Sequence, residues 1–332
     1  MTRIWLNHWF STAYNIINLI REDDKEFQII GSNENKESPI KMACDEWYQE
    51  PVLRDDEYVD FCLDFCKEHA VDIFMPRREM IAISKNKDKF TQLGIKVMVD
   101  DYKYVNMLNH KEQAYEKFLA EGIGRVPEYY LVTTVEQFKE AYYKLVEKDN
   151  MVCFKFVRDE GGTSYRLIDN TRRGYNSLFY KSSTRMTLED VINALSERET
   201  FTPMMVMPYL PDSEISVDCL MTNDGLIAIP RVKDYSRIEK ICYDEEIMST
   251  CKLFFEKIPL EQPCNIQLKY KDGIPYMLEV NTRMSGGVQM ACAASGVNIP
   301  NIAVNKLLGI NKSWENNMLE RCVTHVETPI AL

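Results

Sequence analysis

Short apolar runs alternate with amphipathic segments along the first hundred residues. This pattern predicts strands at 3–6, 27–31 and 71–75, with helices at 13–21 and 58–69 between them. Strands that alternate with helices usually form a parallel sheet whose faces the helices cover. The N-terminal third of the chain is therefore predicted to be an open α/β domain.

The pattern changes after residue 106. A helix is predicted at 111–121, and apolar strands at 151–157, 204–210 and 227–233. The strand at 151–157 carries one lysine, Lys155. Burying a lysine costs several kcal/mol unless an anion meets it. We therefore expect Lys155 to face a ligand phosphate.

Glycine pairs occur at two points where a ligand would need close access to the backbone. Gly161 and Gly162 follow the lysine strand, and the amide groups of such a loop can fold over phosphates. Ser285-Gly286-Gly287 precedes a helix predicted at 288–294, whose N-terminus suits a carboxylate or phosphate. A glycine pair alone is usually only a turn, so both interpretations of each stretch remain open.

The segment Leu278 to Gly287 reads LEVNTRMSGG, in which Glu279, Asn281 and Arg283 are spaced two apart. An extended chain points all three side chains to one face. Carboxylate and amide oxygens suit a hard cation such as Mg²⁺, and an arginine suits the phosphate that the cation bridges. The alternative is a solvated strand end.

The preceding strand supplies a further oxygen donor, Gln267. Lys271-Asp272-Gly273 signals a hairpin. If the loop comprises the three residues 272–274, Gln267 lies directly opposite Glu279 on the same face. The hairpin would then bring Gln267, Glu279 and Asn281 together.

Composition and charge narrow the function classes. The chain has 332 residues, 45% of them hydrophobic, and its net charge of −11 argues against non-specific nucleic-acid binding. No apolar run approaches a membrane span and no signal peptide is recognised, so a cytoplasmic protein is expected. The ten cysteines contain no Cys-x-x-Cys and are interpreted as buried, reduced thiols.

Taken in order, these motifs resemble the ATP-grasp superfamily, nearest to the ATP-binding halves of the carbamoyl phosphate synthetase large subunit. The resemblance implies an α/β ATP-grasp fold with three parts. These are a Rossmann-like pre-ATP-grasp domain at 1–106, a small lid subdomain at 107–204, and an antiparallel C-terminal subdomain with the metal site at 205–332.

The resemblance also implies ATP and Mg²⁺ as cofactors, with Mn²⁺ as an alternative, and it assigns roles by position. The implied residues are Gln267, Glu279 and Asn281 for metal; Lys111, Lys155, Gly161, Gly162, Met207, Tyr209, Leu210 and Glu214 for ATP; Arg231 and Arg283 for catalysis; and Arg77, Lys233, Ser285, Gly286 and Gly287 for substrate. Three positions depart from the family pattern: His110 replaces an aspartate, Pro208 a glutamate, and Ser164 a glycine.

The chemistry implied by the resemblance is that of an ADP-forming carbon–nitrogen ligase. ATP would activate a carboxylate as an acyl phosphate, which an amine or similar nucleophile then attacks. Two alternatives stay open: phosphorylation of bicarbonate or carbamate, and a regulatory subunit that binds nucleotide without turnover. The expected partners are a small carboxylate and an amine, with no nucleic acid and no membrane, and a homodimer is left open.

Overall fold

The computed structural model describes residues 1–8, 12–22, 27–148, 151–158, 162–171, 184–233, 237–315 and 318–326. The chain forms two compact units. Unit 1 comprises Met1–Asn109, Ser213–Leu268 and Glu279–Leu332, and unit 2 comprises His110–Asp212 and Lys269–Leu278. The three domain boundaries expected from the resemblance remain a prediction.

The N-terminal part of unit 1 is a parallel sheet of order β3-β2-β1-β4-β5. Trp5 points to one face of the sheet, whereas Ile4 and Leu6 belong to the core on the other face, because successive strand residues alternate. Helices complete both cores, as the predicted α/β pattern requires. The elements are β1 Arg3–Leu6, β2 Gln28–Asn33, β3 Glu46–Gln49, β4 Ile73–Met75, β5 Lys96–Val97, α1 Thr12–Arg21, α2 Asp55–Glu68, α3 Met80–Lys85, α4 Lys87–Gln92 and α5 Tyr102–Asn109, with a 3-10 helix at Pro39–Ala43.

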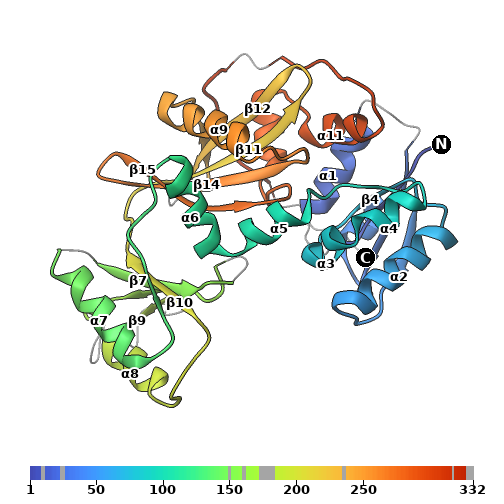
Figure 1. Ribbon diagram of the computed structural model, residues 1–332. Coiled ribbons are helices and arrows are strands. Elements are labelled where there is room, and N and C mark those ends of the chain that lie inside the picture. Colours follow the sequence, from blue (N-terminus) through green and yellow to red (C-terminus); the bar gives the residue numbers. More distant parts are fainter. Residues whose placement is uncertain are drawn as a thin grey trace. The chain divides into compact units, whose positions relative to one another are not determined.

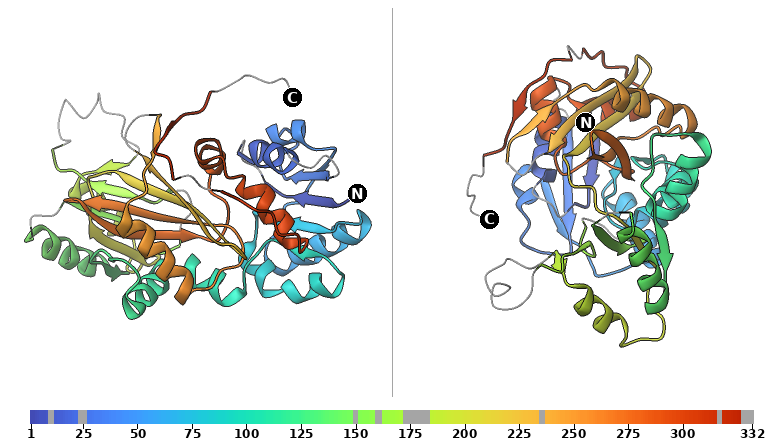
Figure 2. Two further views of the ribbon diagram at one scale, coloured as in Figure 1. Left: turned by 90° about the horizontal axis from the view of Figure 1, so that it is seen from above. Right: turned by 90° about the vertical axis from the view of Figure 1, so that its left-hand side faces the viewer.

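Helix α1 packs between the N-terminal sheet and a helix from the C-terminal part of the chain. Its buried residues Ala13, Ile16, Ile17 and Ile20 form one apolar stripe. Helix α11 (Ile299–Leu307) packs beside it, and Asn301 Nδ2 donates to the Ile20 carbonyl oxygen at 2.8 Å (Figures 1 and 2). Segments almost 300 residues apart therefore share one core.

A second sheet in the chain is antiparallel, with the order β15-β14-β11-β12-β13-β16. Its strands are β11 Glu214–Thr222, β12 Gly225–Lys233, β13 Glu239–Ile241, β14 Cys264–Lys271, β15 Ile274–Asn281 and β16 Cys322–Val323, and α9 Glu245–Lys257 and α10 Val288–Ser295 accompany it.

The β14–β15 hairpin turns through two residues, Asp272 and Gly273, which both have positive φ (53° and 73°). Two successive residues in this region are typical of a type I′ turn. The predicted three-residue loop is wrong by one residue, because Ile274 already belongs to β15.

Unit 2 contains a five-stranded sheet of order β6-β10-β7-β8-β9. Its core includes Phe138, Leu145, Phe154 and Val206. The elements are β6 Tyr130–Val132, β7 Val152–Phe156, β8 Arg166–Ile168, β9 Arg185–Met186, β10 Met204–Pro208, α6 Lys111–Glu121, α7 Val135–Val146 and α8 Leu188–Leu195. Thr187 is the N-cap of α8 and forms a capping box with Asp190. Within the described ranges, none of the helices is both long and apolar enough to cross a bilayer.

A buried carboxylate links two loops of unit 1. Asp100 Oδ1 accepts the amide N–H groups of Glu261 at 2.6 Å and of Gln262 at 3.2 Å. Asp100 Oδ2 is buried and has no hydrogen-bond partner among the described residues. Burial raises the pKa of Asp100 from 3.8 to about 6, although the two amide groups oppose this.

We expect this shift to appear in the pH dependence of stability. Because the folded-state pKa is raised, the folded chain holds the Asp100 proton more tightly than the unfolded chain does. The resulting stabilisation is complete below pH 3.8 and is lost as the pH rises through about 6. The free energy of unfolding of the wild type should fall between pH 4 and pH 7 by about 3 kcal/mol relative to Asp100→Asn. Urea titrations across this range measure the difference, and parallel pH curves would contradict it.

Candidate functional site

The end of β15 carries the predicted metal-binding residues. Asn281 Nδ2 donates to Glu279 Oε1 at 3.3 Å, so these two side chains lie on the same side of the strand. Gln267 is on the neighbouring strand β14, where its Nε2 donates to Asn265 Oδ1 at 3.4 Å. The sequence analysis placed Gln267 opposite Glu279 on the assumption of a three-residue loop. That these two side chains lie together remains a prediction.

The donor set of these residues is one carboxylate and two amides. In the part of the chain that is described, no group of three or more His, Cys, Asp or Glu side chains could hold a metal ion. A divalent ion at β14–β15 would therefore need the amide oxygens of Gln267 and Asn281 beside the Glu279 carboxylate. Hard, oxygen-seeking cations such as Mg²⁺ accept such a set.

Arg283, two residues beyond Asn281, lines a cavity of about 220 Å³ together with Arg77 and His8. We call this the anion cavity. The pKa of His8 is lowered to about 3, mainly by burial and then by the charges of Arg77 and Arg283. At neutral pH His8 is therefore uncharged, and the cavity presents two guanidinium groups. The remaining lining is mostly apolar and consists of Thr12, Ala13, Ile16, Met75, Pro76, Met98, Pro263, Met284, Ser285 and Gly286.

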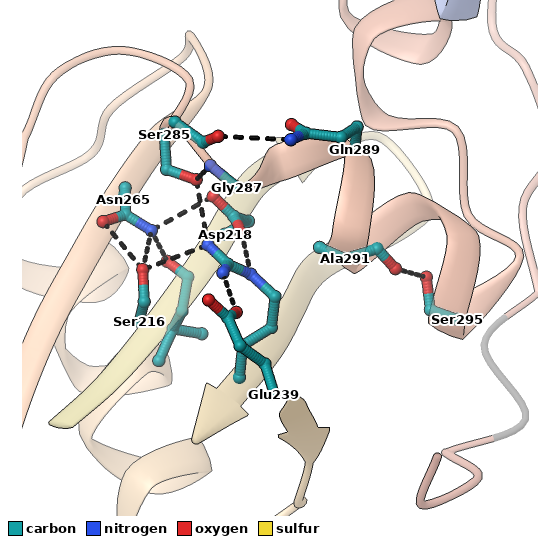
Figure 3. Close-up of polar contacts among 12 residues, drawn as sticks. Ser216, Asp218, Glu239, Asn265, Ser285, Gly287, Gln289, Ala291 and Ser295 are labelled. Atoms are coloured by element: carbon teal, nitrogen blue, oxygen red, sulfur yellow. Dashed lines mark hydrogen bonds and ion pairs between the residues drawn. The ribbon is translucent and has the colours of Figure 1, made fainter. Parts of the chain in front are cut away.

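Arg231 occupies the buried centre of a polar network beside this cavity. It is 0% exposed, its Nε donates to Asp218 Oδ2 at 2.9 Å, and its Nη1 pairs with Glu239. Its Nη2 donates to Ser216 Oγ at 3.2 Å and to Ser285 Oγ at 3.0 Å, and Figure 3 shows these acceptors converging. Burial by itself would lower the pKa of Arg231, but the two carboxylates raise it above its usual value, so the guanidinium stays charged.

The Arg231 network holds the turn that follows the predicted metal strand. Ser285 Oγ also accepts the Gly287 amide N–H at 3.1 Å. A Cβ on Gly287 would lie 2.4 Å from Arg231 Nη1, so the guanidinium would have to shift to admit a side chain. The sequence predicted that a ligand approaches the backbone closely at this glycine. In the structure, the Arg231 guanidinium makes that close approach. A catalytic role for Arg231 remains a prediction, whereas its contacts are those of a residue that positions Ser285.

Sequence reasoning missed the partners of Arg231. Ser216 and Asp218 lie on β11, on the same face as Glu214, and Asn265 Nδ2 donates to Asp218 Oδ1 at 3.1 Å. A signal was present: an arginine in the apolar strand 227–233 requires buried anions, and the alternating Glu-x-Ser-x-Asp of the neighbouring strand supplies one.

Two other predicted residues pair with each other across β11 and β12. Glu214 is directly opposite Lys233, and their charged atoms are 3.1 Å apart. Both side chains are about one-third exposed. Glu214, which is predicted to contact the ribose, and Lys233, which is predicted to contact the substrate, therefore form an ion pair with each other.

In unit 2, Lys155 lies half-buried on β7, opposite Met205 of β10. Ser164 Oγ accepts the Phe156 amide N–H at 2.9 Å, which ties the loop after β7 back to the strand. Gly162 has a φ of 67°, a conformation that favours glycine. Gly161 lies outside the described residues.

Lys111 is buried at the start of α6, next to the N-cap residue His110. Arg158 Nε donates to His110 Nε2 at 2.6 Å. Arginine has no acceptor atom, so His110 Nε2 is the acceptor in this contact. This contact links the start of α6 to the end of the lysine strand, and it was not foreseen from the sequence.

The predicted adenine-binding residues Met207, Tyr209 and Leu210 lie at the end of β10 and directly after it. Met207 and Leu210 are buried, and the Tyr209 amide N–H donates to the Met151 carbonyl oxygen at 2.6 Å. The ammonium group of Lys269 lies 5.9 Å from the centre of the Tyr209 ring. This segment therefore offers apolar side chains and an aromatic ring.

Replacing Gly287 by alanine should break the Arg231 network. The new methyl group would displace the guanidinium, and overpacking of this kind costs about 1–3 kcal/mol of unfolding free energy. Gly286→Ala is the matched control, because the nearest described atom to a Cβ there is Thr12 Oγ1 at 4.0 Å. Urea unfolding measures both variants, and equal stability of the two would show that the network tolerates displacement.

Comparisons with known proteins identify two families along the chain. Residues 200–328 match the family described as ATP-grasp in the biosynthetic pathway with Ter operon, and residues 11–98 match the PylC-like N-terminal domain. A search of curated proteins finds no match.

Solved structures share the fold at low sequence identity. An N5-carboxyaminoimidazole ribonucleotide synthetase in complex with ADP is 11% identical, with a TM-score of 0.71 over 97% of this chain and 80% of that one. The biotin carboxylase domain of the 2-oxoglutarate carboxylase from Hydrogenobacter thermophilus is 16% identical, with a TM-score of 0.69 over 96% and 72%. The N5-carboxyaminoimidazole synthetase from Staphylococcus aureus is 12% identical, with a TM-score of 0.69 over 93% and 78%.

The predicted ATP-grasp fold is confirmed by these structures together with the match at residues 200–328. The Glu-x-Asn-x-Arg strand lies inside that matched region. The similarity to an ATP-grasp family is therefore shown for residues 200–328, and the chain as a whole shares the fold of these structures.

Proposed function

We propose that the protein is an ATP-dependent, ADP-forming ligase that activates a carboxylate as an acyl phosphate for attack by an amine. One observation carries the proposal. The strand that bears Glu279 and Asn281 leads directly to Arg283, which lines the anion cavity with Arg77. Asn281, a proposed ligand of the metal–phosphate group, and Arg283, which could hold a second anion, are thus only two positions apart in the chain.

The metal would be held by oxygens of Glu279, Asn281 and Gln267. Bound Mg²⁺ would neutralise charge on the ATP phosphates during transfer. The remaining ATP contacts follow the roles implied by the superfamily: Lys155, Lys111 and the loop at 161–162 for phosphates, and Glu214 for ribose. The adenine contacts are assigned to Met207, Tyr209 and Leu210.

The anion cavity is assigned to the carboxylate substrate. Arg77 and Arg283 supply donors that hold a carboxylate in a fixed orientation, and uncharged His8 adds a hydrogen-bonding group without further charge. Ser285 and Gly286 form part of the wall, and Arg231 holds Ser285 in place. Catalysis would consist mainly of positioning and charge neutralisation.

The reaction would proceed in two balanced steps. A carboxylate oxygen attacks the γ-phosphorus of ATP, and the bond to the ADP oxygen breaks. The amine nitrogen then attacks the acyl carbon and expels phosphate, so a carbon–nitrogen bond forms and a proton leaves the nitrogen. Arg231, Arg283 and Lys233 would stabilise the phosphoryl group directly or through their contacts.

The related structures support this proposal and one alternative. Two of them are described as complexes with ADP, and the Hydrogenobacter thermophilus structure also contains magnesium and bicarbonate. Bicarbonate phosphorylation is therefore the second candidate. The apolar lining of the anion cavity favours an organic carboxylate, because bicarbonate has no apolar part to bury. That related domain is described as a dimer, which is in line with the homodimer that the sequence leaves open.

Glu279→Gln should reduce ATP-dependent phosphate release by about 100-fold, since a metal-bound carboxylate is replaced by a neutral amide. A panel of carboxylates and amines, assayed for phosphate with and without Mg²⁺, measures the effect. Glu256→Gln, an exposed position on α9, is the control. Full turnover of Glu279→Gln would refute the metal assignment. Magnesium-dependent ATP binding without phosphate release would favour the regulatory-subunit alternative.

Arg77→Met should raise the KM for the carboxylate about 10- to 100-fold and leave the KM for ATP unchanged, because a charge-assisted hydrogen bond is lost. Steady-state kinetics with each substrate varied in turn separates the two constants. Arg198→Met, an exposed arginine, is the matched control. An equal rise in both KM values would remove the anion cavity from carboxylate binding.

A further inference from the structure

A second cavity, of about 390 Å³, lies at the carboxyl end of β2 in unit 1. We call it the β2 cavity. Ligands of open α/β sheets bind outside the carboxyl ends of the strands. The lining residues used below are Asn33, Glu34, Glu37, Ser38, Arg54 and Arg78.

Ser38 gives this cavity an unmet hydrogen-bonding demand. The residue is 2% exposed, and its Oγ has no hydrogen-bond partner among the described residues. A buried hydroxyl without a partner is unfavourable, and native structures rarely keep one without a reason. A ligand in the β2 cavity would satisfy it.

The cationic groups of the cavity are already committed to protein acceptors. Arg78, which is largely buried, donates to Glu34 and to the buried carboxylate of Glu50. Arg54 Nη1 donates to Glu34 Oε1 at 2.7 Å and to the Leu53 carbonyl oxygen at 2.8 Å. Arg78 is therefore paired with two carboxylates, whereas Arg54 is partly exposed and pairs with Glu34 and Glu79.

Carboxylates outnumber the cations around the cavity. Hydrogen bonding from Arg54 is the main reason that the pKa of Glu34 is lowered, so this group is ionised at neutral pH. Glu37 adds an exposed carboxylate at the rim, and Glu79 lies 3.7 Å from Arg54 Nε. The local balance therefore favours a ligand that brings positive charge and donates hydrogen bonds.

We propose that the β2 cavity binds a small molecule carrying a primary ammonium group beside a hydroxyl. The carboxylates of Glu34 and Glu37 receive the ammonium group, and Ser38 Oγ hydrogen-bonds the hydroxyl. Such an amino alcohol is either the amine substrate of the ligase, in which case this inference rests on the proposed function, or an effector that is not consumed.

The two cavities are connected through neighbouring residues. Arg77 lines the anion cavity and Arg78 lines the β2 cavity. Asn33 Nδ2 donates to the carbonyl oxygen of His8 at 3.3 Å, and His8 also lines the anion cavity. A ligand bound in the β2 cavity can therefore affect the anion cavity, to which the carboxylate substrate is assigned.

Calorimetry on the full chain tests the binding directly. The probes are ethanolamine, 3-amino-1-propanol and serinol, with ethylene glycol and glycolate as controls that lack the ammonium group. We expect saturable binding of at least one amine, and none of either control. Failure of all three amines, or equal binding of the controls, would overturn the proposal.

Variants locate the bound amine. Ser38→Ala and Glu37→Gln should each weaken amine binding at least 10-fold with an unchanged melting temperature, whereas Glu57→Gln on α2 should have no effect. Unchanged binding in both cavity variants would overturn the assignment. Glu37 is exposed, so its variant tests the site even if Ser38→Ala perturbs folding.

Turnover assays show whether the bound amine is a substrate or an effector. A substrate is consumed in step with ATP, whereas an effector changes the rate without being consumed. Amine binding without any ATP-dependent phosphate release would retain the β2 site and refute the ligase. ATP-dependent phosphate release without amine binding would refute the β2 site and retain the ligase.

Discussion

The buried charge of Arg231 is the constraint around which this part of unit 1 is built. A guanidinium with no exposed surface is tolerated only when carboxylates and hydrogen-bond acceptors surround it. Asp218 and Glu239 come from the two strands that flank β12, and Ser285 comes from the turn after β15. The interaction therefore ties three strands to the wall of the anion cavity, and a side chain at position 287 would have to displace the Arg231 guanidinium.

The anion cavity shows how burial sets the charge of a site. His8, Arg77 and Arg283 are all basic residues, but burial and the two neighbouring guanidinium groups keep the imidazole neutral. The cavity thus holds two positive charges, with a neutral group that can donate or accept a hydrogen bond. That arrangement suits a carboxylate whose apolar part rests on the methionine and isoleucine side chains of the lining.

The candidate metal site differs from sites that carry several acidic ligands. Its only carboxylate in the predicted trio is Glu279, and the other two ligands are amides. A weakly charged donor set leaves much of the cation's charge available to the phosphates of ATP, which are themselves strong oxygen ligands. Such a site binds metal together with nucleotide more readily than metal alone.

Much of the fold was determined by local sequence. The limits predicted for the β1 strand and the α6 helix agree with those observed, because apolar periodicity and caps act within a few residues. The order of the ATP-grasp motifs was likewise readable, since each motif is a short run of residues. The β14–β15 loop was misjudged because Ile274 fits either a loop or a strand, and only pairing with β14 decides between them.

Tertiary structure alone decided which side chains meet. Asp218 and Glu239 enclose Arg231, and Arg158 reaches His110 across 48 positions of sequence. Ser38, the N-cap residue of the 3-10 helix, is buried and its Oγ has no hydrogen-bond partner among the described residues. The sequence specifies each of these residues and its chemistry, but their environment is created by segments distant in the chain, and burial and charge depend on that environment.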